Sequence, residues 1–294
     1  MFIECIMNEL LTNSTLLTEH IINTLYEANR KKQFYGERLK NKPRPSAVLM
    51  LMGPQCRKAV DGEPCLILNK RSKDVMQPGD LCCPGGGIEC KKDIYLSKLM
   101  DLPGSPLWKW PFWKQWRKLH PRQFKRMRLY LTTGLREGFE EMRLNPLGVR
   151  FLGPLPPQEL VMFKRIIFPL AGWVQRQTRF APNWEVERIV HIPLRNLLKP
   201  ECYALYRIWF ASLKDQKPME FPCFLHQNET EDELLWGATF RMVMAFLDLV
   251  FGFQPPEERS MPVVERVMDD AYLSSPVHLP HSGTTKYTKG TGKS

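Results

Sequence analysis

Three glutamates with helical spacing are the residues of this chain best suited to chemistry. Glu137, Glu140 and Glu141 stand at i, i+3 and i+4 in the run REGFEE, residues 136–141. On a helix, all three carboxylates project from one face. Carboxylates this close raise one another's pKa, and a hard divalent cation such as Mg²⁺ or Mn²⁺ relieves the repulsion. The alternative is an ordinary solvated acidic helix face.

The sequence around the glutamates predicts the helix that carries them. Apolar residues recur every three or four positions from Phe124 to Met142, with Pro121 at the start and Asn145-Pro146 as a stop. Arg136 precedes Glu140 by four residues, so we expect it to orient that carboxylate.

A glycine-rich turn precedes this helix in the chain. Gly85, Gly86 and Gly87 lie in the run PGGGIE, residues 84–89, after a predicted strand. Three glycines permit positive φ angles and close approach of the backbone to a ligand. Taken alone, the run is interpreted as a turn.

Together, PGGGIE and REGFEE resemble the two halves of the Nudix box, G-x5-E-x7-R-E-U-x-E-E-x-G-U. The resemblance implies an α/β fold, a Nudix-like α/β/α sandwich around a mixed β-sheet. It also implies a hydrolase of nucleoside diphosphate derivatives. Arg136, Glu137, Glu140 and Glu141 would be the catalytic residues, and the three glutamates would hold Mg²⁺ or Mn²⁺.

Further segments are similar to the coenzyme A diphosphatase family and extend the resemblance over roughly residues 45–253. The resemblance to this family implies that Arg71, Ser72 and the Gly85–Gly87 turn bind substrate. The segments are KRS (70–72), PGDLCCPGG (78–86), FLGPLPP (151–157), FPLAG (168–172), Asn183-x-Glu185-Val186 with IPL (192–194), and LWGAT (235–239).

The chain also departs from the family pattern. An insertion of about residues 92–127 splits the box, and the glutamate expected after the glycines falls at Lys92, with Asp93 beside it. Gly138 and Arg143 replace an apolar residue and a glycine. A degenerate, inactive member of the family is therefore an alternative.

The insertion is rich in tryptophan and cations. Residues 107–120 hold four of the eight Trp, alternating with Lys and Arg. The plainest interpretation is an ordered lid whose Trp side chains pack back on the domain. A lid facing the substrate and a contact with a membrane surface or another partner are the alternatives.

The net charge of +11 is concentrated in separate pieces. Residues 109–128 carry eight basic side chains and no acid, and residues 30–44 contribute +6. The tail 274–294 adds +3, and the rest of the chain is nearly neutral or acidic, so the charge does not argue for specific nucleic-acid binding. Eight Cys without zinc spacing, no secretory signal and no apolar span predict a cytoplasmic protein.

The remaining pattern sets the domain organisation. We expect an N-terminal helix and basic linker over 1–44, a hydrolase domain over 45–255, and an extension over 256–294, disordered from about 274. Within the chain the pattern predicts one helix over 9–29, strands at 46–52, 64–69, 149–152, 166–174 and 188–192, and a final helix over 231–251. Residues 229–233 are interpreted as a solvated helix start, from which a Glu would reach the metal.

The resemblance implies a specific reaction. Coenzyme A or acyl-CoA would be split into 3′,5′-ADP and (acyl-)4′-phosphopantetheine. The alternatives are another nucleoside diphosphate derivative, such as ADP-ribose or a dinucleotide, and a non-catalytic module that binds RNA or an anionic membrane through the insertion. A homodimer is left open.

Overall fold

The computed structural model describes residues 2–35, 45–54, 62–160, 165–210, 218–227, 232–268 and Tyr272. Most of the predicted basic linker and the tail predicted to be disordered from about 274 lie outside these residues. In the described part of the chain, no helix is long and apolar enough to cross a membrane.

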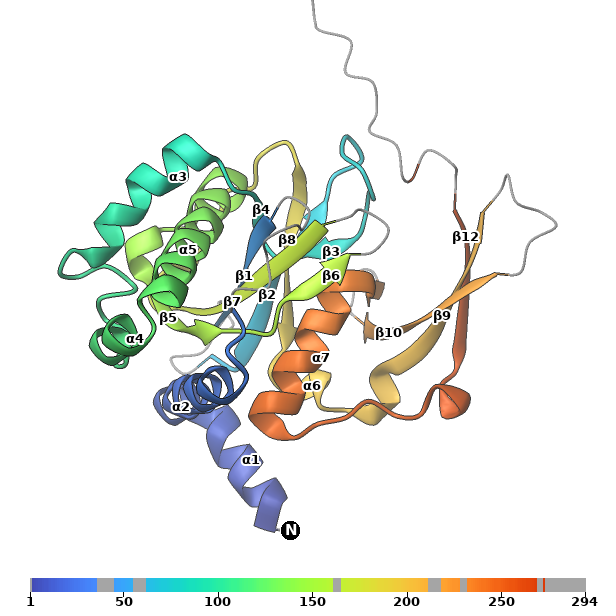
Figure 1. Cartoon of the computed structure of the whole chain (residues 1–294). Helices are drawn as coiled ribbons and strands as arrows, with labels where there is room; N and C mark the ends of the chain where they lie inside the picture. The colour runs from blue at the N-terminus through green and yellow to red at the C-terminus, as the bar shows by residue number, and fades with distance from the viewer. Residues whose placement is uncertain are drawn as a thin grey trace, which may run out of the picture.

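One mixed β-sheet forms the centre of the molecule (Figure 1). Its main path runs β3-β2-β1-β7-β5, while β4 pairs with β1, β6 with β7 and β8 with β2. The β1–β7 pair is parallel and the other pairs are antiparallel, which confirms the expected mixed sheet. The strands are β1 (Pro45–Pro54), β2 (Pro64–Arg71), β3 (Leu81–Cys82), β4 (Gly85–Gly87), β5 (Val149–Pro154), β6 (Gln158–Leu160), β7 (Arg165–Val174) and β8 (Val186–Pro193).

Helices cover both faces of this sheet. Gly134 of α5 (Pro121–Met142) packs on Leu49, where an added Cβ would approach the Leu49 Cβ to 3.2 Å. The neighbouring Val48 points to the opposite face, because side chains alternate along a strand. There it lines a cavity with Met242 of α7 (Gly237–Phe251). The sheet therefore lies between α5 and α7 (Figure 1), as expected for an α/β/α sandwich.

A second sheet, not predicted from the sequence, follows β8. Its order is β11-β10-β9-β12, formed by β9 (Tyr203–Phe210), β10 (Met219–Gln227), β11 (Asp232–Leu235) and β12 (Val263–Met268). Strand β12 pairs in parallel with β9, so part of the predicted C-terminal extension belongs to this sheet.

The predicted helix over 231–251 is wrong in its first part. Residues 232–235 pair with β10, and the helix begins only at Gly237, whose φ of +66° breaks the run. Glu233 is not a solvated helix residue that reaches a metal. It is 2% exposed and pairs with Lys70 and Arg188, at 3.4 and 2.5 Å. Because Glu233 is buried beside these two cations, its surroundings favour a strand over a solvated helix start.

The predicted helix over 9–29 is two helices, α1 (Phe2–Thr12) and α2 (Ser14–Lys32). They are separated by Asn13, whose extended backbone places it at the N-cap of α2. Its Oδ1 accepts hydrogen bonds from the amides of Thr15 and Leu16, both at 3.1 Å. Because the apolar periodicity continues on both sides of Asn13, the sequence pattern does not show the break between the two helices.

The Trp-rich insertion is built into the core. Trp110 and Trp116 are each 1% exposed, and the ring of Tyr26 from α2 stacks on Phe112 at 3.7 Å. The Trp side chains thus pack back on the domain, except Trp108, which is 40% exposed. The insertion contains α3 (Cys90–Ser97), η1 (Lys98–Asp101) and α4 (Trp113–Leu119). Short helical turns elsewhere are η2 (Pro146–Gly148), α6 (Leu194–Leu197), η3 (Pro200–Cys202) and η4 (Glu258–Ser260).

Candidate functional site

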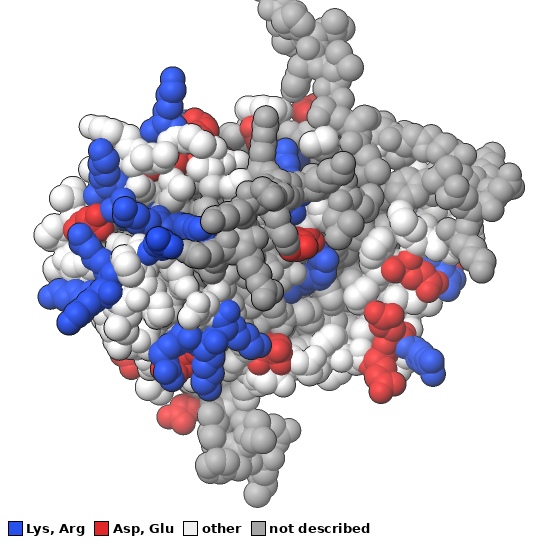
Figure 2. Space-filling view, viewed as in Figure 1, with Lys and Arg blue, Asp and Glu red and all other residues white. Residues whose placement is uncertain are grey.

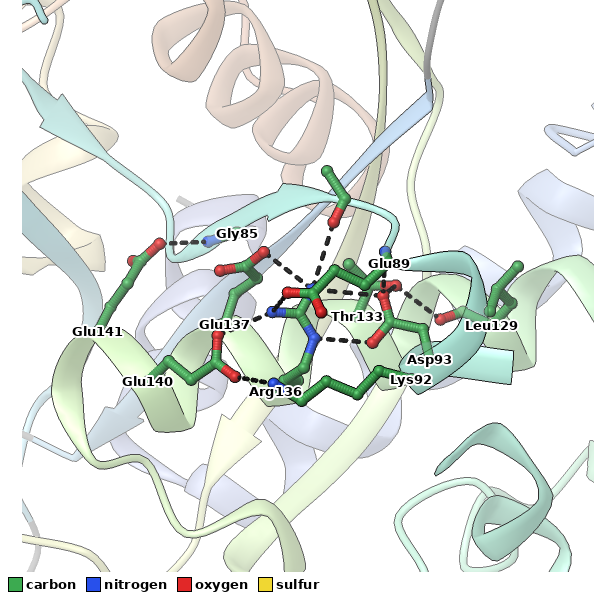
Figure 3. Close-up of polar contacts among 11 residues, drawn as sticks. Gly85, Glu89, Lys92, Asp93, Leu129, Thr133, Arg136, Glu137, Glu140 and Glu141 are labelled. Atoms are coloured by element: carbon green, nitrogen blue, oxygen red, sulfur yellow. Dashed lines mark hydrogen bonds and ion pairs between the residues drawn. The ribbon is translucent and has the colours of Figure 1, made fainter. Parts of the chain in front are cut away.

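Arg136 of α5 is the centre of the acidic cluster (Figure 3). Its buried guanidinium contacts four carboxylates. Nε lies 2.7 Å from Asp93 Oδ1, Nη2 lies 3.0 Å from Glu137 Oε1, and Nη1 lies 2.8 Å from Glu140 Oε2 and 3.2 Å from Glu89 Oε1. The predicted orientation of Glu140 by Arg136 is confirmed. One cation therefore fixes several acids at once.

Asp93 occupies the interior beside this arginine. It is fully buried, and its Oδ2 accepts hydrogen bonds from the Glu89 amide at 2.8 Å and from Thr133 Oγ1 at 2.9 Å. Burial alone would raise the pKa of Asp93, but these hydrogen bonds and that from Arg136 lower it. The neighbouring Lys92 lies on the exposed side of α3, with Nζ 2.5 Å from Glu140 Oε1. Of the two neighbours at the position where the family pattern expects a glutamate, it is therefore Asp93, and not Lys92, that pairs with Arg136.

The glycine-rich turn packs against the same helix. Gly85 has a φ of +155°, and an added Cβ would collide with the Ala47 carbonyl oxygen of β1. A Cβ on Gly86 would overlap the Glu137 carboxylate, whereas Gly87 has open space around it. The Gly87 carbonyl oxygen accepts a hydrogen bond from Arg136 Nη2 at 3.2 Å. Gly85 is therefore required by close packing against the backbone of β1, whereas a side chain at Gly86 would force the Glu137 carboxylate to turn away.

Glu141 is the carboxylate directed at the glycine turn (Figure 3). Oε2 accepts a hydrogen bond from Asn69 Nδ2 at 2.7 Å, and Oε1 accepts one from the Gly85 amide at 3.4 Å. Burial, and secondly the charge of Glu137, raise the pKa of Glu141 to about 8. Burial also raises the pKa of Glu137, although Arg136 opposes this. The two acids repel each other, and Glu141 lies at the edge of a cavity.

That cavity has a volume of about 210 Å³ and lies between the sheet and α7. Its polar wall includes Glu141, Asn69, Arg71, Arg165 and Glu185, and its apolar wall includes Val48, Leu160, Ile167, Val186 and Met242. Gly85 and Gly86 also line it. An acidic edge, two arginines and an apolar wall suit a ligand that carries both phosphates and a less polar group.

The cavity brings together most of the residues predicted to bind substrate. Arg71 lines it, held by a hydrogen bond from its Nε to the Met76 carbonyl oxygen at 2.7 Å. Ser72 does not line it. Its amide donates to the Glu185 carbonyl oxygen at 2.9 Å, and its Oγ accepts from the Asp74 amide at 3.2 Å. Ser72 thus shapes the loop next to the cavity.

The predicted metal ligands share one helix but do not form a preformed cage. Among the described residues, no three His, Cys, Asp or Glu side chains converge on one point. Glu140 turns to Lys92 and Arg136, while Glu141 turns to the glycine turn. The donor set nevertheless fits a divalent cation, because Glu141 is partly buried beside Glu137 and pairs with no cation in the described part of the chain.

Three residues of this site were not among the predicted site residues. Asn69 ends a predicted strand, and Glu185 stands in the Asn183-x-Glu185-Val186 segment, so their position next to other motifs was an available signal. Arg165 follows a stretch without a motif. It begins β7 and pairs there with Leu160 of β6, and both residues line the cavity.

Comparison with known proteins adds one sequence relative. No protein-family model matches the chain. Over 117 residues it is 31% identical to an uncharacterized Nudix hydrolase, NudL, of Pectobacterium atrosepticum. Over this region the chain is therefore similar to a Nudix hydrolase. The matched region spans 40% of this chain and 56% of the length of that relative.

Solved Nudix structures show only a low overall likeness. The Nudix hydrolase RenU of M. smegmatis gives a TM-score of 0.33 at 12% identity, covering 52% of this chain and 73% of its own. A C. elegans Ap4A hydrolase gives 0.32 at 12% identity, covering 53% and 84%. The NUDIX domain of Shewanella oneidensis NrtR, complexed with ADP ribose, gives 0.31 at 14% identity, covering 57% and 84%.

Proposed function

We propose that this chain is a metal-dependent pyrophosphohydrolase of the Nudix type. Its proposed reaction cleaves the diphosphate of coenzyme A or an acyl-CoA, giving 3′,5′-ADP and (acyl-)4′-phosphopantetheine. The observation that carries the proposal is Glu141, a partly buried carboxylate with a raised pKa beside Glu137, which lines the edge of a cavity. Glu141 has no cationic partner in the described part of the chain, whereas Glu137 beside it pairs with Arg136. Together they offer the carboxylate oxygens that Mg²⁺ or Mn²⁺ prefers.

The roles proposed for the glutamates follow from their contacts. Glu137 and Glu141 would hold the cation at the glycine turn, and Glu140 would join them when it leaves Lys92. A bound Mg²⁺ or Mn²⁺ would neutralise the diphosphate and lower the pKa of a water molecule. Arg136 fixes Glu137 and Glu140 through its guanidinium, which restricts their rotamers.

The substrate would lie in the cavity between the sheet and α7. Arg71 and Arg165 are the cations on its wall, so they are proposed to contact the phosphates. The apolar wall formed by Val48, Leu160 and Met242 is suited to the less polar part of the ligand. The preference for coenzyme A over ADP-ribose or a dinucleotide rests on the KRS and PGDLCCPGG segments.

A substrate panel tests the proposal directly. The purified chain is incubated with coenzyme A, acyl-CoA, ADP-ribose and NADH plus Mg²⁺ or Mn²⁺, and the products are identified by mass. We expect 3′,5′-ADP from the CoA substrates, loss of turnover on chelation, and at least about a hundredfold lower kcat in Glu141→Gln. The matched control is Glu187→Gln on β8, an exposed glutamate outside the cavity.

Other outcomes of the same panel would redirect the proposal. Products only from ADP-ribose or NADH would keep the hydrolase and change the substrate. Near-wild-type kcat in Glu141→Gln would reject the proposed metal site. No hydrolysis of any diphosphate would favour the degenerate member of the family. A cytoplasmic location and a homodimer stay predictions.

A further inference from the structure

The outer surface of the insertion combines exposed apolar side chains with cations. We call the surface formed by Tyr95, Lys98, Leu99, Leu102, Trp108 and Lys109 the insertion face. Its apolar members are 70% exposed at Tyr95, 47% at Leu99, 54% at Leu102 and 40% at Trp108. Large apolar side chains this exposed and this close in sequence mark a site of interaction.

These side chains follow one another closely along the chain. Helix α3, which carries Tyr95, runs directly into the 3-10 turn η1, which carries Leu99. Leu102 caps this turn, with a hydrogen bond from its amide to the Leu99 carbonyl oxygen at 3.1 Å. The opposite side of the same run is buried through Asp93 and Ser97. The exposed stripe therefore has no partner in the described part of the chain.

Hydrogen bonds hold Trp108 beside the end of this run. The Ser105 hydroxyl donates to the Met100 carbonyl oxygen at 2.6 Å and accepts from the Trp108 amide at 3.1 Å. An ion pair between Asp101 and Arg128 fixes η1 to α5. The exposed tryptophan is thus part of an ordered face.

The surroundings of this face are strongly cationic. Residues 90–128 contain eleven Lys and Arg against two Asp, a net charge of +9. Both aspartates are already engaged, Asp93 by Arg136 and Asp101 by Arg128. Within the described residues, Lys98 and Lys109 pair with no acid, and the same holds for Lys114, Arg117 and Lys118 of α4. Figure 2 shows Lys and Arg side chains gathered where Figure 1 draws α3 and α4.

We propose that the insertion face docks on the surface of an anionic lipid bilayer. Trp and Tyr favour the headgroup boundary, Leu99 and Leu102 can enter the acyl region, and the unpaired cations meet lipid phosphates. Lys98 lies 6.0 Å from the centre of the Tyr95 ring, so charge and apolar surface are contiguous. Nucleic acid fits less well, because aliphatic side chains offer no stacking surface for bases.

Docking would leave the acidic cluster and the bilayer on opposite sides of one helix. The inner side of α3 carries Asp93 against Arg136, and its outer side carries Tyr95 of the insertion face. The docking surface does not depend on the proposed hydrolase activity.

Vesicle flotation with the full chain tests the proposal. Vesicles of phosphatidylcholine alone are compared with vesicles of equal parts phosphatidylcholine and phosphatidylglycerol. One variant removes apolar contacts, Leu99→Ser with Leu102→Ser, and another reverses charge, Lys98→Glu with Lys109→Glu. The controls are Val267→Ser, 68% exposed on β12, and Lys199→Glu, exposed before η3. Circular dichroism and coenzyme A hydrolysis are measured for every variant.

We expect wild type and both controls to float with the anionic vesicles and not with phosphatidylcholine alone. Each double variant should lower partitioning at least about tenfold while its circular dichroism is unchanged. Absence of flotation of wild type at low salt, or flotation of both double variants equal to that of wild type, would overturn the proposal. Tight RNA binding that is lost in the charge-reversal variant, without flotation, would overturn it in favour of nucleic acid. Hydrolysis that survives in the double variants separates docking from catalysis.

Discussion

Asp93 and Arg136 stand 43 residues apart in the chain, yet Asp93 Oδ1 lies 2.7 Å from Arg136 Nε in the interior. The first belongs to the start of the insertion and the second to the helix with the glutamates. Their contact, with the bond from Arg136 Nη2 to the Gly87 carbonyl oxygen, closes in space a motif that is split in sequence. The insertion therefore leaves the acidic cluster intact.

Breaking this pair should weaken the fold and the site together. In Asp93→Asn the buried guanidinium loses a charged partner, while its bonds to Glu137 and Glu140 remain. We expect a loss of about 1–3 kcal/mol in the free energy of unfolding, measured by urea denaturation. The control, Glu27→Gln, removes an exposed i,i+3 pair with Arg30 and should leave stability unchanged. Equal stability of Asp93→Asn and wild type would contradict a structural role.

The two adjacent glycines offer a matched pair of substitutions. In Gly86→Ala the new Cβ overlaps the Glu137 carboxylate, so this side chain must turn away. In Gly87→Ala the Cβ enters open space. We expect Gly86→Ala to lower kcat at least about tenfold and to weaken Mn²⁺ binding, followed by electron paramagnetic resonance. Gly87→Ala should match wild type, and similar behaviour of the two would reject the close packing as the cause.

The elements around the candidate site follow from local sequence pattern. The stripe from Phe124 to Met142 with Pro121 at its start predicts α5, and the predicted strand over 46–52 lies within β1. The i, i+3, i+4 spacing of the glutamates needs only the geometry of a helix. These predictions required no information about distant contacts.

The features that the sequence did not predict depend on contacts between residues that lie far apart in the chain. Strand β11 has its partner in β10, and its Glu233 is buried because Lys70 and Arg188 come from two other strands. Arg165 begins β7, which pairs with β1 from Ile166 onward and so joins the wall of the cavity to a distant part of the chain. No local periodicity reports such pairings, so the second sheet and the place of Arg165 in the cavity wall could not be predicted.

The raised pKa of Glu141 predicts how stability depends on pH without metal. Its folded pKa of about 8 exceeds the unfolded value, so the native state binds more protons between about pH 4.5 and 8. Stability in chelator should therefore fall as pH rises through this window, by at most about 1.4 kcal/mol per pH unit from this group. Thermal melts in EDTA check this prediction.

The variant Glu141→Gln supplies the comparison for these melts. It cannot ionise, so its stability in EDTA should decline less between pH 5 and 8. For wild type, added Mn²⁺ should raise the melting temperature more at pH 8 than at pH 6, because the metal must displace a proton. The same pH dependence in the variant and wild type would show that another group titrates.

Trp116 lies on the buried side of the insertion and Trp108 on its exposed side. Trp116 is 1% exposed, with its ring 5.7 Å from that of Tyr26, whereas Trp108 is 40% exposed. We expect Trp116→Ala to lower the free energy of unfolding by about 3–5 kcal/mol, because it leaves a cavity between α2 and α4. Trp108→Ala should change it by less than about 0.5 kcal/mol. Urea denaturation of both variants decides, and equal losses would mean that Trp108 belongs to the core and is not free to meet a bilayer.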